Sequence, residues 1–229
     1  MPPLPFQVVA FDLDGTLADT SPDIAAALNR MLAALGRAQL PQGSIRRLVG
    51  HGARSLVERA LAATGGAPEE LVDRGLPLYL DFYAAGVCNG TEPYPGVERA
   101  LDELAAAGSS LAVCTNKGER LTHLLLDALG WQGRFAAVVG GDTLPTRKPD
   151  PAMLHEAIAR AGGGPALFVG GSITDADTAR AAGVPFVAVS FGFSDRPAEA
   201  LGADLVIDAF DALPVAVRQL AARNAFSSR

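Results

Sequence analysis

Residues 8–17 carry the sequence Val-Val-Ala-Phe-Asp-Leu-Asp-Gly-Thr-Leu, in which a short apolar run stops at an acid. A run of this kind, followed by turn-forming residues, predicts a strand buried on both faces, as in a parallel sheet. Asp12 would follow the carboxyl end of that strand, where open parallel sheets bind their ligands. Asp14 comes two residues later, and Gly15 permits a tight turn. The stretch therefore predicts two carboxylates in a ligand-binding crevice.

Two carboxylates at this spacing suit phosphoryl transfer. A carboxylate is a competent nucleophile toward phosphorus, and a covalent intermediate divides one difficult displacement into two easier ones. A second carboxyl group can protonate the leaving oxygen and later deprotonate water. Asp12 is thus the candidate nucleophile and Asp14 the candidate general acid and base. The alternative is that both acids merely cap a turn at the end of the strand.

The composition predicts an ordinary globular protein, because 49% of the 229 residues are hydrophobic and 19% are charged. A net charge of -6 without a cluster of basic residues argues against a nucleic-acid partner. Cys88 and Cys114 are too few for a disulfide framework or a zinc site, so we expect reduced thiols. Residues 1–6 do not resemble a signal peptide, and no apolar run reaches membrane-spanning length. We therefore expect a cytoplasmic protein with no membrane partner.

Beyond the first strand, the sequence predicts strands alternating with helices and one helical insertion. No convincing strand lies between residues 17 and 87, and Pro77 should kink or divide the last helix there. The predicted helices of the insertion span residues 21–36, 44–49, 53–64 and 68–85, and the later predicted strands span 111–114, 136–139, 166–169, 184–189 and 204–208. We predict a doubly wound parallel α/β sheet from residues 1–16 and 89–229, with an inserted all-helical cap domain at residues 17–88.

Further polar residues follow the predicted strands. Thr115 and Asn116 come after the strand at 111–114, where a hydroxyl and turn N–H groups could hold phosphate oxygens. Turn residues also gather at such exits for structural reasons alone. Lys148 lies in a loop rich in glycine and proline, where an ammonium could stabilise both the nucleophile and the transferring group. The alternative for Lys148 is a solvated surface lysine.

The run from Phe11 to Leu17 resembles the first signature of the haloacid dehalogenase-like hydrolases, most of which are magnesium-dependent phosphatases. Thr115 occupies the place of the family's second signature, and Lys148 followed by Pro149 matches its third. The resemblance covers nearly the whole chain and implies a Rossmann-like hydrolase core with a small helical cap. Within the family, residues 49–61 and 140–151 look most like phosphoglycolate phosphatases.

The fourth signature of the family usually reads Gly-Asp-Ser-x-x-Asp, and its acids hold magnesium. Here residues 170–175 read Gly-Gly-Ser-Ile-Thr-Asp, so Gly171 replaces the first acid. The resemblance leaves Asp12, Asp175 and the backbone carbonyl of Asp14 as metal ligands, and Mg²⁺ commonly needs only one or two carboxylates. We therefore expect weakened magnesium binding, in which Ser172 or a water could fill the gap. An inactivating replacement is the alternative.

The resemblance also suggests substrate contacts in the cap. Gly50, His51 and Arg54 belong to the segment that looks like phosphoglycolate phosphatases, and the two charged or polar side chains could reach a substrate carboxylate. A histidine beside glycines has many uses, so an exposed loop position is the alternative for His51. Arg54 could equally be a solvated helix residue.

Together these features predict a magnesium-dependent phosphomonoesterase for a small phosphorylated metabolite, with 2-phosphoglycolate the leading substrate. The predicted reaction passes through an aspartyl-phosphate on Asp12, while Thr115, Asn116 and Lys148 hold the phosphoryl oxygens. The enzymatic alternatives are a phosphosugar phosphatase, a pyrophosphatase or a β-phosphoglucomutase-like transferase. Because of Gly171, a catalytically weakened protein that only binds a phosphorylated ligand is a further alternative. We expect a monomer or a homodimer.

Overall fold

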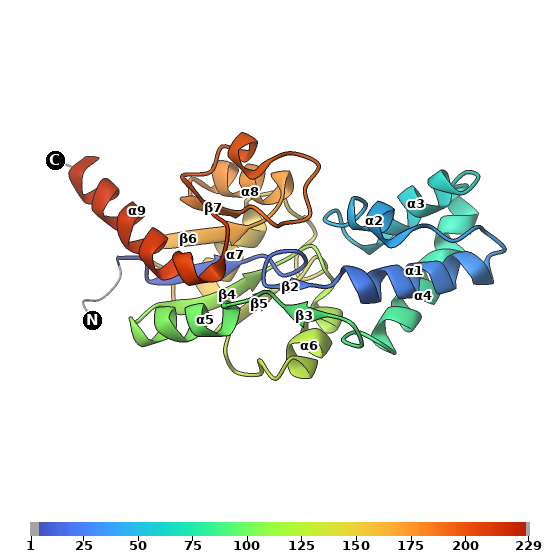
Figure 1. Ribbon diagram of the computed structural model, residues 1–229, viewed down its shortest axis with the longest axis horizontal. Helices are drawn as coiled ribbons and strands as arrows, with labels where there is room; N and C mark the ends of the chain where they lie inside the picture. Colours follow the sequence, from blue (N-terminus) through green and yellow to red (C-terminus); the bar gives the residue numbers. More distant parts are fainter. Residues whose placement is uncertain (1–4, 228–229) are drawn as a thin grey trace.

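A computed structural model of the protein describes residues 5–227, with side chains described for residues 5–220 and 222. Six parallel strands form one sheet (Figure 1). In sheet order they are β5 (Ala137–Val139), β4 (Ser110–Cys114), β1 (Val8–Phe11), β6 (Ala166–Gly170), β7 (Phe186–Val189) and β8 (Leu205–Ile207). β1 lies inside the sheet and is buried along its whole length, as its apolar sequence predicts.

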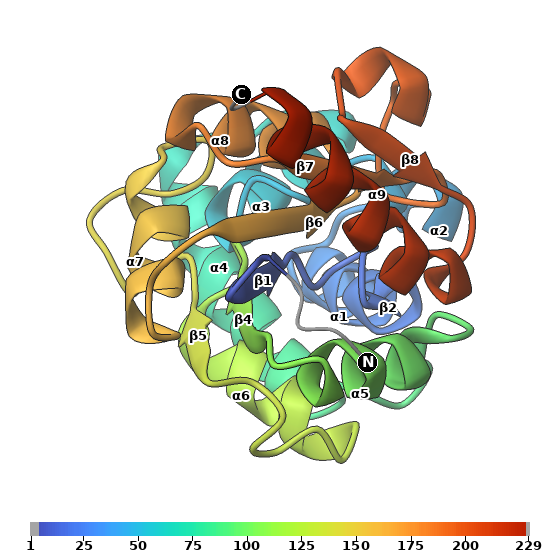
Figure 2. The ribbon, with the colours of Figure 1, turned by 90° about the vertical axis from the view of Figure 1, so that its left-hand side faces the viewer.

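Helices cover both faces of the sheet, because successive residues of β1 point to opposite sides. Val9 and Phe11 pack into one layer, whereas Val8 and Ala10 pack into the other. The first layer contains α5 (Val97–Ala106), α6 (Glu119–Ala128) and α9 (Leu213–Ser227), and the second contains α7 (Ala152–Arg160) and α8 (Ile173–Ala182) (Figure 2). Two 3₁₀ helices, η1 (Ala198–Leu201) and η2 (Phe210–Ala212), precede α9. The predicted doubly wound α/β fold is therefore confirmed.

A separate group of helices, here called the cap, lies beside the carboxyl-terminal edge of the sheet (Figure 1). The cap consists of α1 (Ser21–Ala34), α2 (Gln42–Arg46), α3 (Ala53–Ala63) and α4 (Glu69–Ala84), all within the predicted insertion. Pro77 does not divide α4, which runs through it as one helix. A Cβ atom at Gly75 would lie only 3.1 Å from the sulfur of Met31, which shows how closely α4 and α1 pack.

Two short strands join the cap to the core, and the first of them corrects the prediction that no strand occurs between residues 17 and 87. β2 (Ala18–Asp19) pairs antiparallel with β3 (Glu92–Pro93). Two-residue strands carry no recognisable periodicity, so sequence patterns cannot find them. The buried Asp23 carboxylate also accepts hydrogen bonds from the backbone N–H of Gly90 at 3.0 Å and of Thr91 at 2.8 Å. The outgoing and returning linkers are thus held side by side.

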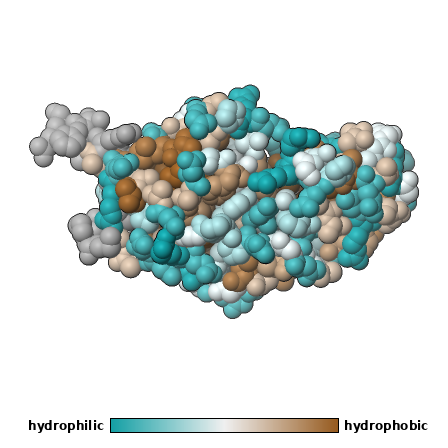
Figure 3. Space-filling view, in the orientation of Figure 1, coloured by the Kyte–Doolittle hydropathy of each residue, from teal (hydrophilic) through white to brown (hydrophobic). Residues whose placement is uncertain are grey.

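No helix within residues 5–227 is long and apolar enough to span a bilayer. Hydrophilic residues are spread over both the core and the cap on the face drawn in Figure 3. The expectation that the chain has no signal peptide rests partly on residues 1–4, which lie outside the described residues. Cys88 and Cys114 are free thiols, as predicted.

Candidate active site

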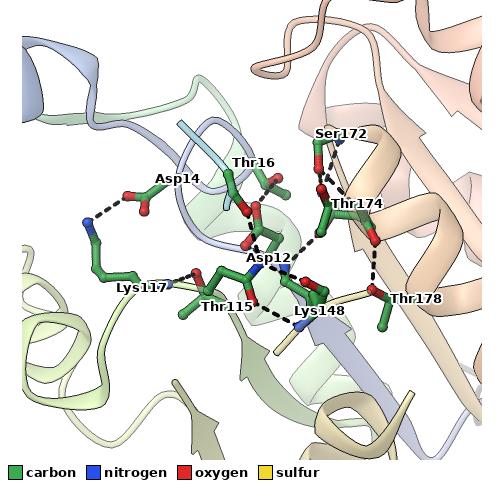
Figure 4. Close-up of polar contacts among 12 residues, drawn as sticks. Asp12, Asp14, Thr16, Thr115, Lys117, Lys148, Ser172, Thr174 and Thr178 are labelled. Carbon is green, nitrogen blue, oxygen red and sulfur yellow. Dashed lines mark hydrogen bonds and ion pairs between the residues drawn. The ribbon is translucent and has the colours of Figure 1, made fainter. Parts of the chain in front are cut away.

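A buried cluster of three charged groups forms at the carboxyl end of β1. Two of its members, Asp12 and Lys148, are labelled in Figure 4. The ammonium of Lys148 lies 2.8 Å from Oδ1 of Asp12 and 2.6 Å from Oδ1 of Asp175. Burial and the neighbouring carboxylate of Asp175 raise the pKa of Asp12 above its ordinary value, despite the opposing effect of Lys148. Burial disfavours the charge on Lys148, but the two carboxylates outweigh it and raise its pKa. The cluster therefore holds two acids against one permanent cation.

Asn116 fixes the loop that carries Lys148. Its Oδ1 accepts a hydrogen bond from the backbone N–H of Lys148 at 2.9 Å, and its Nδ2 donates to the carbonyl of Lys148 at 3.1 Å. The same Nδ2 donates to the carbonyl oxygen of Gly50 in the cap at 2.9 Å. The amide nitrogen of Asn116 therefore donates to two backbone carbonyls, one in the core and one in the cap, and so links the core to the cap.

Asp175 is fixed by the first turn of α8. Its Oδ2 accepts hydrogen bonds from the backbone N–H groups of Gly171 and Ser172 and from the Ser172 hydroxyl, at 3.1, 3.0 and 2.6 Å. Ser172 in turn caps the helix by accepting from the backbone N–H of Asp175, which completes a capping box. The other carboxylate oxygen, Oδ1, is left to face Lys148. Helix capping and the charged cluster thus use opposite sides of one side chain.

Asp14 faces a second lysine that the sequence analysis did not assign. Oδ1 of Asp14 lies 3.0 Å from the ammonium of Lys117, which also donates to the hydroxyl of Tyr83 in α4 at 2.8 Å. Thr115 supports this arrangement, because its Oγ1 accepts from the backbone N–H of Lys117 at 3.2 Å. One signal in the sequence could have found Lys117, since Lys117 and Lys148 are the only lysines among 19 cationic residues.

These groups line one pocket between the core and the cap, here called the central pocket. From the core it is lined by Asp12, Asp14, Thr115, Asn116, Lys148 and Asp175 among others, and from the cap by Gly50 as well as Ile24, Leu56, Tyr79 and Tyr83. The structure thus brings together the predicted residues of the core and Gly50.

His51 and Arg54 do not join the central pocket. His51 is exposed and lines a neighbouring groove, and Arg54 pairs on the surface with Asp73 at 2.7 Å and with Glu69 at 3.7 Å. Arg54 lies in the first turn of α3 and His51 lies just before the helix, but sequence spacing cannot tell which way their side chains turn. The acidic residues of α4 draw Arg54 away from the pocket, because an exposed guanidinium gains more from an adjacent carboxylate than from water alone.

The space beside Gly171 is filled by backbone. A Cβ atom there would lie 2.8 Å from Cα of Gly192 and 3.0 Å from the carbonyl oxygen of Gly15. The missing acid of the sequence pattern therefore cannot be restored without moving the loop that follows β7. Close approach of two chain segments is one of the uses for which glycine is selected.

The acids of the central pocket fit a magnesium ion with few protein ligands. Among the residues that the structure describes, no three acidic, histidine or cysteine side chains gather into a metal cluster. Asp12 and Asp175 nevertheless place two carboxylates against the single ammonium of Lys148, which leaves one unbalanced negative charge before any phosphate arrives. Mg²⁺ is commonly held by one or two carboxylates, with phosphate oxygens and waters as its other ligands.

Comparison with known proteins agrees with this site. The model of the haloacid dehalogenase-like hydrolases matches residues 6–183. A phosphoglycolate phosphatase of Mesorhizobium japonicum is 46% identical over 95% of this chain and 97% of its own length. One from Caulobacter vibrioides is 45% identical over 91% of this chain and 89% of its own. The crystal structure of a predicted phosphoglycolate phosphatase from Haemophilus somnus superposes with a TM-score of 0.86 at 30% identity, covering 91% of this chain and 96% of that one.

Proposed function

The chain belongs to the haloacid dehalogenase-like hydrolases and is a phosphatase, and we propose that it hydrolyses 2-phosphoglycolate to glycolate and phosphate. The observation that carries the proposed chemistry is the buried cluster in which Lys148 faces both Asp12 and Asp175. The names of the similar phosphatases support the choice of substrate. A small anionic substrate also suits a central pocket that contains two lysines between apolar walls.

In the proposed reaction Asp12 attacks phosphorus and forms an aspartyl-phosphate. Lys148 lies against the attacking carboxylate and would neutralise charge on the phosphoryl oxygens as they approach. Asp14 would donate a proton to the departing glycolate oxygen and then take one from the water that hydrolyses the intermediate. The two acids have separate cation partners, Lys148 for Asp12 and Lys117 for Asp14, which supports separate roles.

We further propose that Mg²⁺ is the cofactor, held by the carboxylates of Asp12 and Asp175 and the backbone carbonyl of Asp14. When bound, it would supply charge neutralisation for the phosphate, which adds negative charge to a cluster already rich in carboxylate. Asp175 is held through Oδ2 by Ser172 and Gly171, so its other oxygen, Oδ1, would be presented in a fixed direction. With Gly171 in place of a further acid, affinity for the ion should be low.

The cap would close the pocket during the reaction. Asn116 already bonds the carbonyl of Gly50, and Tyr83 of α4 contacts Lys117, so core and cap meet around the pocket. Exclusion of bulk water strengthens the electrostatic interactions inside a closed site. The paired linkers give the cap a common point about which it could move.

A substrate panel tests this proposal. The purified full chain is assayed with Mg²⁺ on 2-phosphoglycolate, pyrophosphate, glucose 6-phosphate and β-glucose 1-phosphate. We expect kcat/KM to be higher for 2-phosphoglycolate than for the others by about tenfold or more, a difference of roughly 1.4 kcal/mol in transition-state binding. Equal or higher activity on a phosphosugar or on pyrophosphate would reject 2-phosphoglycolate. Chelation of magnesium should abolish turnover, and turnover that persists would reject the cofactor.

A further inference from the structure

Lys117 is a buried cation that pairs with Asp14, but the proposed phosphoryl transfer gives it no contact with the substrate. Of the 19 basic residues in the chain, 17 are arginine, and the two lysines both line the central pocket. Lys117 is 9% exposed and Lys148 is 5% exposed, although lysine is almost never buried without a partner. Lys148 is explained by Asp12 and Asp175. Lys117 needs an explanation of its own.

The surroundings of Lys117 hold its ammonium on the side of the pocket where Asp14 lies (Figure 4). Its two polar partners are Oδ1 of Asp14 at 3.0 Å and the hydroxyl of Tyr83 at 2.8 Å, and its ammonium lies 4.3 Å from the centre of the Tyr83 ring. Burial raises the pKa of Tyr83 well above its usual value, so the hydroxyl stays neutral and leaves the positive charge uncancelled. Within this trio only Asp14 balances that charge.

The position of Lys117 relative to Asp14 identifies the part of a substrate that it would meet. Lys148 contacts the nucleophile and therefore belongs to the phosphoryl end, whereas Asp14 is the group proposed to protonate the leaving oxygen. A cation paired with Asp14 therefore lies beside the leaving group. Among the described residues that line the central pocket, Lys117 and Lys148 are the only basic ones, so no arginine or histidine competes for this role.

We propose that Lys117 recognises a carboxylate on the leaving group, and that it exchanges its ion pair with Asp14 for one with the substrate. This inference rests on the proposed function and assigns the substrate selectivity to a core lysine, in place of His51 and Arg54. Before substrate binds, the ion pair lowers the cost of burying the ammonium and holds Asp14 in place. A phosphorylated short-chain acid supplies a replacement anion and releases the Asp14 carboxyl group for proton transfer. The cap contributes to this selectivity through Tyr83, whose hydroxyl positions the Lys117 ammonium.

The proposal predicts a loss of selectivity rather than a general loss of rate. The variants Lys117→Met and Lys117→Gln are assayed on 2-phosphoglycolate and on ethyl phosphate, which has a methyl group where the carboxylate would be. We expect kcat/KM for 2-phosphoglycolate to fall by about 10- to 100-fold, mainly through KM, as for loss of one charged hydrogen bond. Ethyl phosphate should change by no more than about threefold.

A matched control removes a different cation from the same region. Arg120 lies in the first turn of α6, three residues after Lys117, and is exposed. Arg120→Met should leave both substrates unchanged, because an exposed charge is screened by solvent. If Lys117→Met slows both substrates equally through kcat, the lysine only positions Asp14 and the proposal is wrong. If the parent enzyme itself fails to prefer 2-phosphoglycolate over ethyl phosphate, the proposed substrate is wrong as well.

A second measurement uses the parent protein, so it tests the proposal even if the Lys117 variants do not fold. In the parent protein labelled with ¹³C at lysine Cε, only two lysine signals exist, and Lys148→Arg assigns them. Glycolate, which carries the carboxylate without phosphate, should shift the signal of Lys117. Inorganic phosphate should shift that of Lys148. A Lys117 signal that does not respond to saturating glycolate would overturn the proposal.

Discussion

Asn116 of the core and Gly50 of the cap are joined by a hydrogen bond of 2.9 Å, donated by the Asn116 amide to the Gly50 carbonyl oxygen. The same side chain brackets Lys148 by bonding both its N–H and its C=O. One amide therefore holds the backbone of Lys148, the proposed catalytic lysine, and also contacts the cap. Because the loop with Lys148 and the cap are far apart in the chain, this bridge couples two segments that sequence patterns treat separately.

Replacing Asn116 by alanine should lower kcat, since Lys148 would lose both hydrogen bonds that orient its backbone. We expect a reduction of about 10- to 100-fold, the size often found when supporting partners of catalytic groups are removed. Steady-state kinetics on 2-phosphoglycolate measure the change in kcat, and thermal unfolding measures any change in stability.

A second asparagine provides the control for that experiment. Asn29 brackets Leu40 in the same way, accepting from its N–H at 2.8 Å and donating to its C=O at 2.9 Å, but it lies within the cap. Asn29→Ala should cost similar stability and leave kcat unchanged. Equal rate losses in both variants would mean that general destabilisation, not the position of Lys148, explains the Asn116 effect.

Asp12→Asn should abolish turnover and at the same time stabilise the fold at neutral pH. Burial and Asp175 raise the pKa of Asp12 in the folded protein, so ionisation of this carboxyl costs folding free energy. The stability tied to its protonated form is fully present below the ordinary value of 3.8 and is lost as the pH rises through the raised pKa. The amide is neutral at every pH, so the advantage of the variant should shrink on acidification.

Thermal unfolding of the parent and the Asp12→Asn variant between acidic and neutral pH, in the presence of a chelator, measures the sign of their stability difference. A variant that is less stable than the parent at neutral pH would show that the ion pair with Lys148 outweighs burial. Retention of turnover by this variant would reject Asp12 as the nucleophile, whatever its stability.

The two thiols should differ in reactivity. Cys114 is fully buried at the end of β4, and burial raises its pKa to about 12, so its thiolate fraction at pH 8 is about 10⁻⁴. Cys88 is partly exposed beside the linker that returns from the cap. A thiol reagent should therefore modify one cysteine in the folded protein and two after denaturation. Rapid modification of both in the folded state would contradict the buried position of Cys114.

Short-range patterns predicted those parts of the structure that depend on local sequence. The apolar run at β1 and the acids that follow it are adjacent in the chain, so a buried strand of a parallel sheet could be inferred from residues 8–17 alone. The glycines and prolines around Lys148 likewise suggest a loop of fixed shape, although they leave a solvated surface lysine as the alternative. The helices of the cap appear within a few residues of their predicted limits, because their apolar residues recur at helical spacing.

Contacts over long sequence separations could not be predicted. Tyr83 lies in an apolar helical pattern and resembles an ordinary core residue until its hydroxyl is seen to meet Lys117, 34 residues away. The direction of Arg54 depends on Asp73, which comes from another helix of the cap. The closed space beside Gly171 depends on Gly192, in a loop after a different strand. Each of these follows from tertiary packing, which no local pattern records.

Gly171 provides the last prediction, because it replaces an acid expected from the resemblance and also touches the backbone of Gly192. Both Gly171→Ala and Gly171→Asp place a Cβ atom 2.8 Å from Cα of Gly192, so both should lower the melting temperature. Only the aspartate adds a carboxylate beside Asp12 and Asp175. Compared with the alanine variant, it should reach half-maximal turnover at a magnesium concentration about tenfold lower, the scale of effects at metal sites. Turnover is measured against magnesium concentration for the parent and both variants. The alanine variant reports the steric effect of the added Cβ atom, and the difference between the two variants reports the effect of the added carboxylate. An aspartate variant that needs as much magnesium as the alanine variant would show that position 171 does not face the ion, and that the two remaining acids form the complete carboxylate set.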